Sequence, residues 1–422
     1  MLWLCCQPAA YALESPAGLG GDGGEAMILV EEHSGKVLYE KNERQLMYPA
    51  STTKIMTALL LLEHVAPQET VTVGEEILLI GPDSSNAGLA VGDKISAADL
   101  LGAMLIPSGN DAAYAAAVYI ARQASARPGM PTPEALQYFA NMMNDRARGL
   151  GALNTHFVNP DGYHHPDHYS SAYDLSLISR AALQNELFRR AVQAPVYEAT
   201  IIRHGEPLSL TWYNTNLLLH RQMPQYYPRA TGLKTGYTPQ AGSNLVATAT
   251  DGELDLLAVI LNSSDEGRWQ EAVALFDYGF SHFQSFSVVE KGQVVATAAL
   301  SGQSKGEKAE VPALAGTGYE DILSVEEISR LEQIITWDSR LLSGKDKTRL
   351  KAPLKEGQVI GLARYILDGQ VLFETELLSG SAVRARFPWE KYLAPALLLP
   401  LLFVIIKRRQ RIASPSRRRR RF

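Results

Sequence analysis

The stretch PASTTKIMTALLLLEH, residues 49–64, limits the fold more than any other part of the sequence. Apolar side chains occupy nearly every side of the helix that it predicts, and such a helix is normally buried. Lys54 lies at the start of the apolar run, although burying an unpaired ammonium group is costly. We therefore expect this helix at the centre of a folded unit, with Lys54 either paired or neutral.

The composition is that of a folded protein with more than one unit. The chain has 422 residues, of which 46% are hydrophobic and 20% charged. This length exceeds a single domain of ordinary size. The net charge of −5 hides an asymmetry, because residues 407–422 carry nine basic side chains and no acid, which leaves −14 on the rest. An acidic body argues against nucleic acid as its partner.

Residues 1–12 have the character of a signal segment. They are mostly apolar and end in Ala10-Tyr11-Ala12, a small-x-small site typical of signal cleavage. The segment is short and lacks a basic start, so we expect it to be part of a longer signal. Cys5 and Cys6 are the only cysteines, so a mature protein without this segment would contain no disulfide.

The segment 389–406 is predicted to be a single transmembrane helix. It is uncharged over 392–406, and Trp389 suits a membrane interface. The basic tail 407–422 is expected in the cytoplasm, which places the body on the extracytoplasmic face of the cell membrane. Two prolines in the segment suggest an alternative, in which it lies on the membrane surface.

Strand patterns at both ends of residues 27–283 enclose a helical middle. The first strands are expected in 27–41 and the last between 232 and 264. Helices are predicted from Ser51, within 97–122 with a break at 107–110, at 134–148, at 172–191 and at 267–282. This order predicts an α+β fold, in which helices cover both faces of one antiparallel sheet.

Residues 284–386 alternate apolar and polar side chains between glycine turns, with one helical insert near 325–335. This pattern predicts a small β-rich domain. The segment contains few side chains suited to catalysis, so we interpret it as a spacer or contact module.

The position of Lys54 at the start of a buried helix has a chemical explanation. Ser51 and Lys54 are three positions apart, so they share one face of a helix. Burial and the positive end of the helix both lower the pKa of a lysine. A neutral amine can remove the proton of a nearby hydroxyl, which would make Ser51 a nucleophile. A solvated lysine at a helix start would be the simpler interpretation of this motif alone.

Two more motifs accompany the first one. Ser108-Gly109-Asn110 lies in the break between two predicted helices, and Lys234-Thr235-Gly236 lies on a predicted strand. Gly236 would allow a substrate to approach the backbone closely. The order Ser-x-x-Lys, Ser-x-Asn, Lys-Thr-Gly is the motif set of class A β-lactamases and penicillin-binding proteins.

With these motifs the chain resembles the D-alanyl-D-alanine carboxypeptidases, which are low-molecular-mass penicillin-binding proteins. The resemblance extends from Met27 to Ala385 and includes IPSGNDAA, THFVNPDGYHHPDHYSSAYDLSLISR and ATGLKTGYTPQAGSNLVATAT. It implies a β-lactamase/transpeptidase-like fold for 27–283, followed by the C-terminal domain of these enzymes. The implied partners are peptidoglycan stem peptides that end in D-Ala-D-Ala, with β-lactams as inhibitors.

The resemblance also implies roles for the catalytic residues. Ser51 would attack the carbonyl between the two alanines while Lys54 takes its proton. Ser108 and Asn110 would pass a proton to the leaving amine and orient the substrate amide. Water would then hydrolyse the acyl-enzyme.

Further residues are implied to bind the substrate. Lys234 and Thr235, together with Gly236, would hold the terminal carboxylate. The backbone N–H groups of Ser51 and Tyr237 would form the oxyanion hole. Arg268 would add a second positive group near the carboxylate, although an arginine at such a place is often simply solvated.

Two other functions compete with this one. A class A β-lactamase needs a glutamate in a Glu-x-x-Leu-Asn loop for deacylation, and residues 111–233 contain no such sequence. A membrane-tethered penicillin sensor or scaffold would be acylated without turnover, but no signalling domain follows Ile406. We therefore favour the carboxypeptidase.

The histidine-rich segment HHPDHY needs a separate judgement. His164, His165 and His168, with His156 and Asp161, could form a metal site. A serine mechanism needs no metal, and the segment resembles a structural turn in this family. We therefore expect no metal and no cofactor, with His168 as a hydrogen-bonded packing residue.

Overall fold

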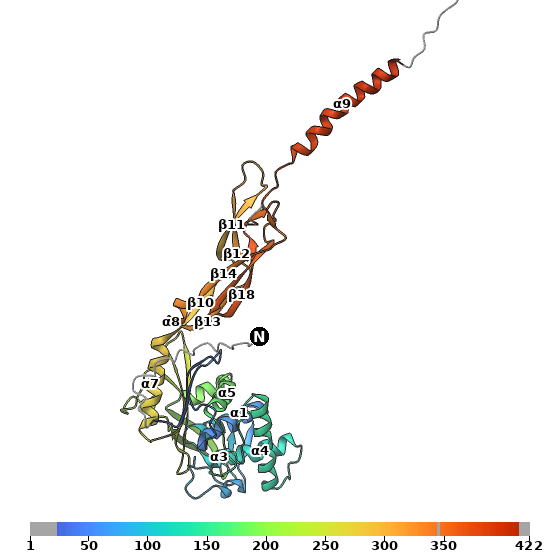
Figure 1. The fold of residues 1–422 in the computed structure, drawn as a ribbon. Helices are drawn as coiled ribbons and strands as arrows, with labels where there is room; N and C mark the ends of the chain where they lie inside the picture. Colours follow the sequence, from blue (N-terminus) through green and yellow to red (C-terminus); the bar gives the residue numbers. More distant parts are fainter. Residues whose placement is uncertain (1–22, 344–346, 413–422) are drawn as a thin grey trace, which may run out of the picture. The chain divides into compact units, whose positions relative to one another are not determined.

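The computed structural model describes residues 23–343 and 347–412 (Figure 1). The chain divides into two compact units, which contain residues 1–285 with 322–325, and residues 286–321 with 326–422. The predicted signal segment 1–12, with both cysteines, lies outside the described residues. The same holds for the end of the basic tail.

The first unit is built on a five-stranded antiparallel sheet with the strand order β2-β1-β9-β8-β7. The strands are β1 (Ala26–Glu31), β2 (Val37–Lys41), β7 (Ala230–Thr238), β8 (Gly242–Thr250) and β9 (Asp255–Ser263). Met27 pairs with Ile260, so the two ends of the unit meet in the middle of the sheet. The predicted antiparallel sheet, built from strands at both ends of the unit, is therefore confirmed.

Both faces of this sheet are covered. In β1, Ile28 and Val30 belong to one buried apolar cluster, while Met27 and Leu29 belong to a second cluster on the opposite face. Helix α7 (Gly267–His282) contributes to the second cluster, and the remaining helices of the unit contribute to the first. The alternation follows from the two-residue period of a strand, and it confirms the predicted helices on both faces.

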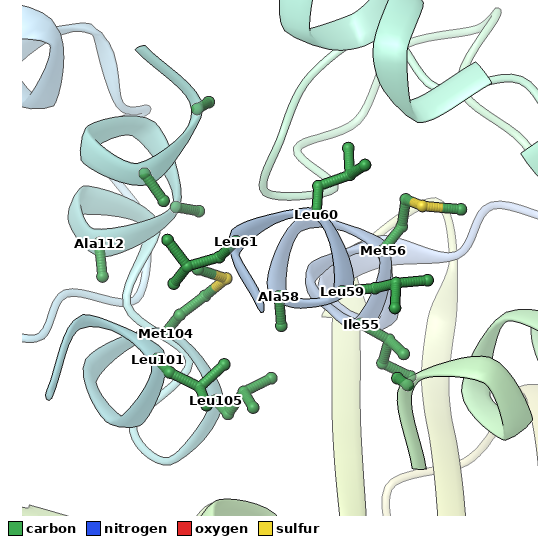
Figure 2. Close-up of a cluster of buried hydrophobic side chains, with 14 of the residues drawn as sticks. Ile55, Met56, Ala58, Leu59, Leu60, Leu61, Leu101, Met104, Leu105 and Ala112 are labelled. Atoms are coloured by element: carbon green, nitrogen blue, oxygen red, sulfur yellow. The ribbon is translucent and has the colours of Figure 1, made fainter. Parts of the chain in front are cut away.

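Helix α1 (Lys54–His64) is the buried helix that its sequence predicts. All its residues from Lys54 to Leu61 are buried, and it packs on α2 (Ala97–Leu105) and α3 (Asn110–Ala124). Figure 2 shows Leu61 pointing toward α2. One detail differs from the prediction, because residues Ala50–Thr53 form a 3-10 turn, η1, and the α-helix begins only at Lys54.

The other helices of this unit are α4 (Thr132–Gly149), α5 (Ala172–Leu183) and α6 (Glu186–Gln193). The segment 172–191 was predicted as one helix and is in fact two. The side chain of Asn185 accepts hydrogen bonds from the N–H groups of Leu187 and Phe188, at 2.9 and 3.3 Å. Such an N-cap starts a new helix, which explains the break.

A second, four-stranded sheet in this unit was not predicted. Its strands are β3 (Thr70–Thr72), β4 (Lys94–Ser96), β5 (Val196–Arg203) and β6 (Glu206–Tyr213), in that order. Strands β5 and β6 form a hairpin that turns at His204 and Gly205, both with positive φ. Two short 3-10 turns, η2 (Glu75–Leu79) and η3 (Leu217–Leu219), complete the unit.

The second unit is rich in strands, as predicted, and its main sheet has the order β14-β17-β18-β12-β11-β16-β15. The elements of this part of the chain are β10 (Phe283–Val289), β11 (Val294–Ser301), β12 (Glu310–Ala315), β13 (Tyr319–Ser324), α8 (Val325–Arg330), β14 (Glu332–Trp337), β15 (Leu342–Ser343), β16 (Arg349–Lys351), β17 (Val359–Leu367) and β18 (Gln370–Ser379). The predicted helix near 325–335 is too long, because β14 follows α8 and pairs with β17.

Helix α9 (Trp389–Ile412) ends the described chain. Across residues 23–343 and 347–412, no helix has both the length and the apolar character that crossing a membrane requires. The transmembrane helix predicted over 389–406 is therefore not confirmed.

Candidate active site

Ser51 and Lys54 are brought together as their spacing predicts. The amine Nζ of Lys54 lies 2.9 Å from the hydroxyl Oγ of Ser51 and also 2.9 Å from the backbone carbonyl oxygen of Asp161. Ser51 lies in η1, directly after Ala50, whose φ is +48°. A positive φ in a residue other than glycine is strained, and here it aims the hydroxyl at the amine.

Lys54 has the chemistry of a base. Its side chain is completely buried, and burial lowers its pKa to about 8, although the nearby carboxylates of Asp161 and Asp111 oppose this shift. A lysine with this pKa has a much larger neutral fraction near pH 7 than an exposed lysine. It can therefore accept the proton of the Ser51 hydroxyl.

The Ser108-Gly109-Asn110 motif forms the predicted break between α2 and α3. Ser108 has φ +66°, and both Ser108 and Asn110 are buried. The N–H of Asn110 donates to the carbonyl of Ser85 at 2.8 Å. This bond ties the motif to the loop that precedes α2 and fixes the start of α3.

Asp111 ties that loop to α3, and sequence analysis did not single it out. Its buried carboxylate accepts hydrogen bonds from the N–H groups of Ala87 and Leu89 at 2.9 and 3.0 Å. A carboxylate at the start of a helix is also stabilised by the helix dipole. The result is a fixed link between α3 and residues 85–89.

The third motif lies on β7, the edge strand of the sheet. A Cβ atom on Gly236 would lie 2.9 Å from the carbonyl oxygen of Pro49 and 3.1 Å from the nitrogen of Ser51. The missing side chain therefore lets β7 approach the turn that carries Ser51. The sequence had instead predicted that Gly236 lets a substrate approach the backbone closely.

Lys234 is buried, and its Nζ donates to the carbonyl of Thr235 at 3.0 Å. Burial is the main cause that holds the pKa of Lys234 well below its usual value, and the positive charges of Lys54 and Arg268 add to the effect. The three cationic side chains thus act on one another electrostatically in one region of the unit.

Thr215 is a second residue that sequence analysis missed. Its hydroxyl lies 2.6 Å from the hydroxyl of Thr235, and its N–H donates to the carbonyl of Ile106 at 3.1 Å. Thr215 therefore connects the Lys-Thr-Gly strand to the end of α2. Its position after the unpredicted hairpin explains why no sequence signal pointed to it.

Arg268 is more than a solvated residue at the start of α7. Its Nη2 donates to the Asp265 carboxylate at 2.6 Å, and its Cζ lies 4.5 Å from the ring centroid of Trp269. Its Nε is buried and has no hydrogen-bond partner among the described residues. Burial lowers the pKa of the guanidinium group. The Nε–H group of Arg268 is therefore available to donate to a ligand.

A cleft of about 550 Å³ opens at Ser51. The residues that line it are Ser51, Asp83, Ser84, Ser85, Asn110, Asp161, Gly162, Tyr163, His164, Tyr237, Thr238, Pro239 and Gln240. Of the predicted site residues, Ser51, Asn110 and Tyr237 are in this lining. The others are not; they are Lys54, Ser108, Lys234, Thr235, Gly236 and Arg268. A separate depression of about 460 Å³ along α7 contains none of the predicted residues.

The histidine-rich segment contributes His168 to the packing of the unit. His168 is buried, its Nδ1 accepts from the N–H of Val158 at 3.1 Å, and its Nε2 lies 2.8 Å from the hydroxyl of Thr53. Burial lowers its pKa to about 3, so the ring is neutral and Nε2 donates. Within residues 23–343 and 347–412, no three His, Cys, Asp or Glu side chains are grouped as metal ligands.

Gly162 lies against the backbone of the turn that carries Ser51, and this contact can be tested. Its φ is +85°, and a Cβ atom there would lie 1.8 Å from the carbonyl oxygen of Ala50. Gly205 has a similar φ of +88° but no atom within 4 Å of the added Cβ. We expect Gly205→Ala to cost about 1–2 kcal/mol through backbone strain alone. Gly162→Ala should cost about 1–3 kcal/mol more through overpacking.

The comparison is made by urea unfolding of the two variants and the wild type, followed by tryptophan fluorescence. Equal losses of stability in the two variants would show that Gly162 does not hold the loop against the Ser51 turn.

The geometry agrees with what known proteins show. Residues 23–265 match the peptidase S11 family of D-alanyl-D-alanine carboxypeptidases, and residues 283–385 match the C-terminal domain of penicillin-binding protein 5. The chain is 29% identical to the D-alanyl-D-alanine carboxypeptidase DacF of Bacillus subtilis over 89% of this chain and 90% of the relative. It is 30% identical to DacC of Escherichia coli, over 88% and 87%.

Solved structures show the same similarity. The Streptomyces K15 DD-transpeptidase has a TM-score of 0.57 and 32% identity, covering 62% of this chain and 98% of that one. Penicillin-binding protein 5 from Haemophilus influenzae has a TM-score of 0.59 and 28% identity, covering 86% and 98%. These matches cover the buried serine–lysine pair, the Ser-x-Asn turn and the Lys-Thr-Gly strand, and the chain belongs to the D-alanyl-D-alanine carboxypeptidase family of serine peptidases.

Proposed function

We propose that the chain removes the terminal D-alanine from peptidoglycan stem peptides through an acyl-enzyme on Ser51. The observation that carries the proposal is the 2.9 Å contact between Lys54 Nζ and Ser51 Oγ, at a lysine whose pKa burial lowers to about 8, which increases the neutral fraction that can accept a proton. Lys54 takes the hydroxyl proton, Ser51 Oγ attacks the carbonyl between the two alanines, and the C–N bond breaks.

The leaving amine of D-alanine needs a proton. Ser108 and Asn110 are both buried, and Asn110 lines the cleft together with Ser51. We assign the proton transfer to Ser108 and the orientation of the substrate amide to Asn110, whose Oδ1 is buried with no hydrogen-bond partner among the described residues. The proton that Lys54 removed from Ser51 thus ends on the departing amine.

The charged end of the substrate is assigned to the strand β7. Lys234 and Thr235 hold the terminal carboxylate, and Arg268 adds a second positive charge, as its influence on the pKa of Lys234 supports. The N–H groups of Ser51 and Tyr237 stabilise the oxyanion. A site that attracts a carboxylate next to the nucleophile favours substrates that end there.

The family binds β-lactams, and a penicilloyl adduct on Ser51 is the corresponding expectation for this chain. Rapid β-lactam destruction, a sensor without turnover, and the peptide transfer named for the Streptomyces relative are the competing outcomes. They differ in the fate of the acyl-enzyme. Water would attack it in β-lactam destruction, an amine would attack it in peptide transfer, and in a sensor it would persist.

We further propose that the catalytic unit works on the extracytoplasmic face of the cell membrane, where peptidoglycan lies. Exposed apolar side chains of α9 support attachment to a membrane; they are Trp389, Tyr392, Leu399, Leu401, Leu402, Phe403, Val404, Ile405 and Ile406. Basic residues follow them in the sequence and would be attracted to anionic lipid headgroups.

The central test is release of D-alanine from a peptide that ends in D-Ala-D-Ala. We expect turnover by the wild type and none by Ser51→Ala, and benzylpenicillin should add its mass to the wild type only. A peptide with a C-terminal carboxamide should react more slowly, because it lacks the carboxylate that Lys234 and Arg268 would bind. An unchanged mass of the wild type after benzylpenicillin would contradict the proposed nucleophile.

The rate of acylation should depend on pH through Lys54. Only the neutral amine can accept the Ser51 proton, and the neutral fraction grows as pH rises through the pKa of about 8. The second-order rate constant with benzylpenicillin should therefore rise about tenfold per pH unit well below 8 and level off above it. Stopped-flow mixing across this range measures it, and a flat profile would remove Lys54 as the base.

Attachment of α9 to lipid is tested with the full chain. We expect it to sediment with vesicles that contain anionic lipid, and to do so less at high salt, which screens the basic residues. Neutral vesicles provide the control for the apolar contribution. A full chain that stays in the supernatant with both kinds of vesicle would exclude this mode of attachment.

A further inference from the structure

Asp161 carries a carboxyl group that the reaction described so far does not use. The residue is 1% exposed and lines the cleft together with Ser51 and Asn110. Its Oδ1 accepts a hydrogen bond from the N–H of Tyr163 at 3.2 Å. Its Oδ2 is buried and has no hydrogen-bond partner among the described residues. A buried acceptor without a donor is costly, so its presence beside a reactive serine calls for a ligand.

The backbone fixes Asp161 close to the nucleophile. Lys54 Nζ lies 2.9 Å from the carbonyl oxygen of Asp161 and 2.9 Å from Ser51 Oγ, so these two oxygens are at most twice that distance apart. The next residue, Gly162, lies against the Ala50 carbonyl so tightly that no side chain fits between them. Asp161 therefore keeps its place relative to Ser51.

Burial makes this carboxyl a stronger base than an exposed aspartate. Burial raises the pKa of Asp161, and the positive charge of Lys54 from α1, the backbone hydrogen bond from Tyr163 and a side-chain hydrogen bond with Asn110 partly oppose this. Tyr114 of α3 faces the same carboxyl, and His164 lies beside it in the cleft. None of these groups forms a salt bridge with Asp161, so its unpartnered oxygen can accept a proton from water.

We propose that the Asp161 carboxylate is the general base that activates the water which hydrolyses the acyl-enzyme on Ser51. This inference rests on the proposed function and adds the residue responsible for its second half. Residues 111–233 contain no Glu-x-x-Leu-Asn loop, and the structure offers a different carboxylate, from the loop that also supports Lys54.

The step balances with the groups in place. Asp161 Oδ2 takes a proton from water as the water oxygen bonds to the ester carbonyl carbon. The bond between that carbon and Ser51 Oγ then breaks. Lys54, which acylation leaves neutral, takes the proton from the Asp161 carboxylic acid and passes one to Ser51 Oγ, so that both groups return to their starting states. The products are the free serine and the shortened peptide, whose new carboxyl group loses its proton to solvent.

The first experiment separates the two halves of turnover in the variant Asp161→Asn. D-Alanine leaves during acylation, so the variant should release one equivalent in a burst and then turn over slowly. Removal of a general base should slow deacylation by about 10²–10⁴-fold. Acylation by benzylpenicillin should stay within about threefold of the wild type. Asp167→Asn, which removes a charge from an exposed position of the same loop, is the matched control and should behave as wild type.

A second experiment distinguishes a base from a residue that only supports the fold. Formate should accelerate deacylation of Asp161→Ala, because it can occupy the space of the missing carboxylate and accept the proton. The wild-type deacylation rate should also fall as pH drops through the pKa of Asp161, and Asp161→Asn should lack this dependence. If Asp161→Asn does not fold, Asp161→Ala with and without formate decides the question.

The outcomes identify which proposal fails. If benzylpenicillin does not acylate the wild type, the proposed function is wrong. If the wild type and Asp161→Asn are acylated alike and release the acyl group at the same rate, only the role of Asp161 is wrong. Equal slowing of acylation and deacylation, without rescue by formate, would also overturn it, because that pattern indicates a structural role.

Discussion

The amine of Lys54 is held between two oxygen atoms, the Ser51 hydroxyl and the Asp161 carbonyl, and its side chain is completely buried. The proposed chemistry of the first unit depends on this contact. An ammonium ion there would be poorly solvated, so the surroundings favour the neutral amine and thereby create a base. The apolar helix behind Lys54 is what keeps water out.

Close backbone approach holds the parts of the site together. Two glycines let neighbouring segments reach the Ser51 turn, Gly162 from the histidine-rich loop and Gly236 from β7. Ala50 and Ser108 both have positive φ values at the two turns that carry reactive side chains. The strain at these residues is sustained because helices and sheet on either side are fully packed.

The sequence was sufficient to predict those parts of the fold whose apolar residues recur periodically or that carry a motif. The buried helix after Ser51, the strands of the central sheet and the broken helix pair around Ser108 all follow from such signals. The hairpin β5–β6 was missed, and so was Thr215, which follows it. Asn185 divides one predicted helix into two through a cap that periodicity does not record. Asp161 was considered only as a metal ligand, because its proximity to Lys54 depends on a contact between segments 107 residues apart.

The mutual influence of Lys54, Lys234 and Arg268 has a consequence for binding. The region holds three cationic side chains in a buried setting, and the pKa values of all three are depressed by burial. An arriving anion changes this balance, because its negative charge favours the protonated form of Lys234. If this region binds the terminal carboxylate as proposed, ligand binding is coupled to proton uptake from the buffer, and the affinity for anionic substrates weakens as the pH rises.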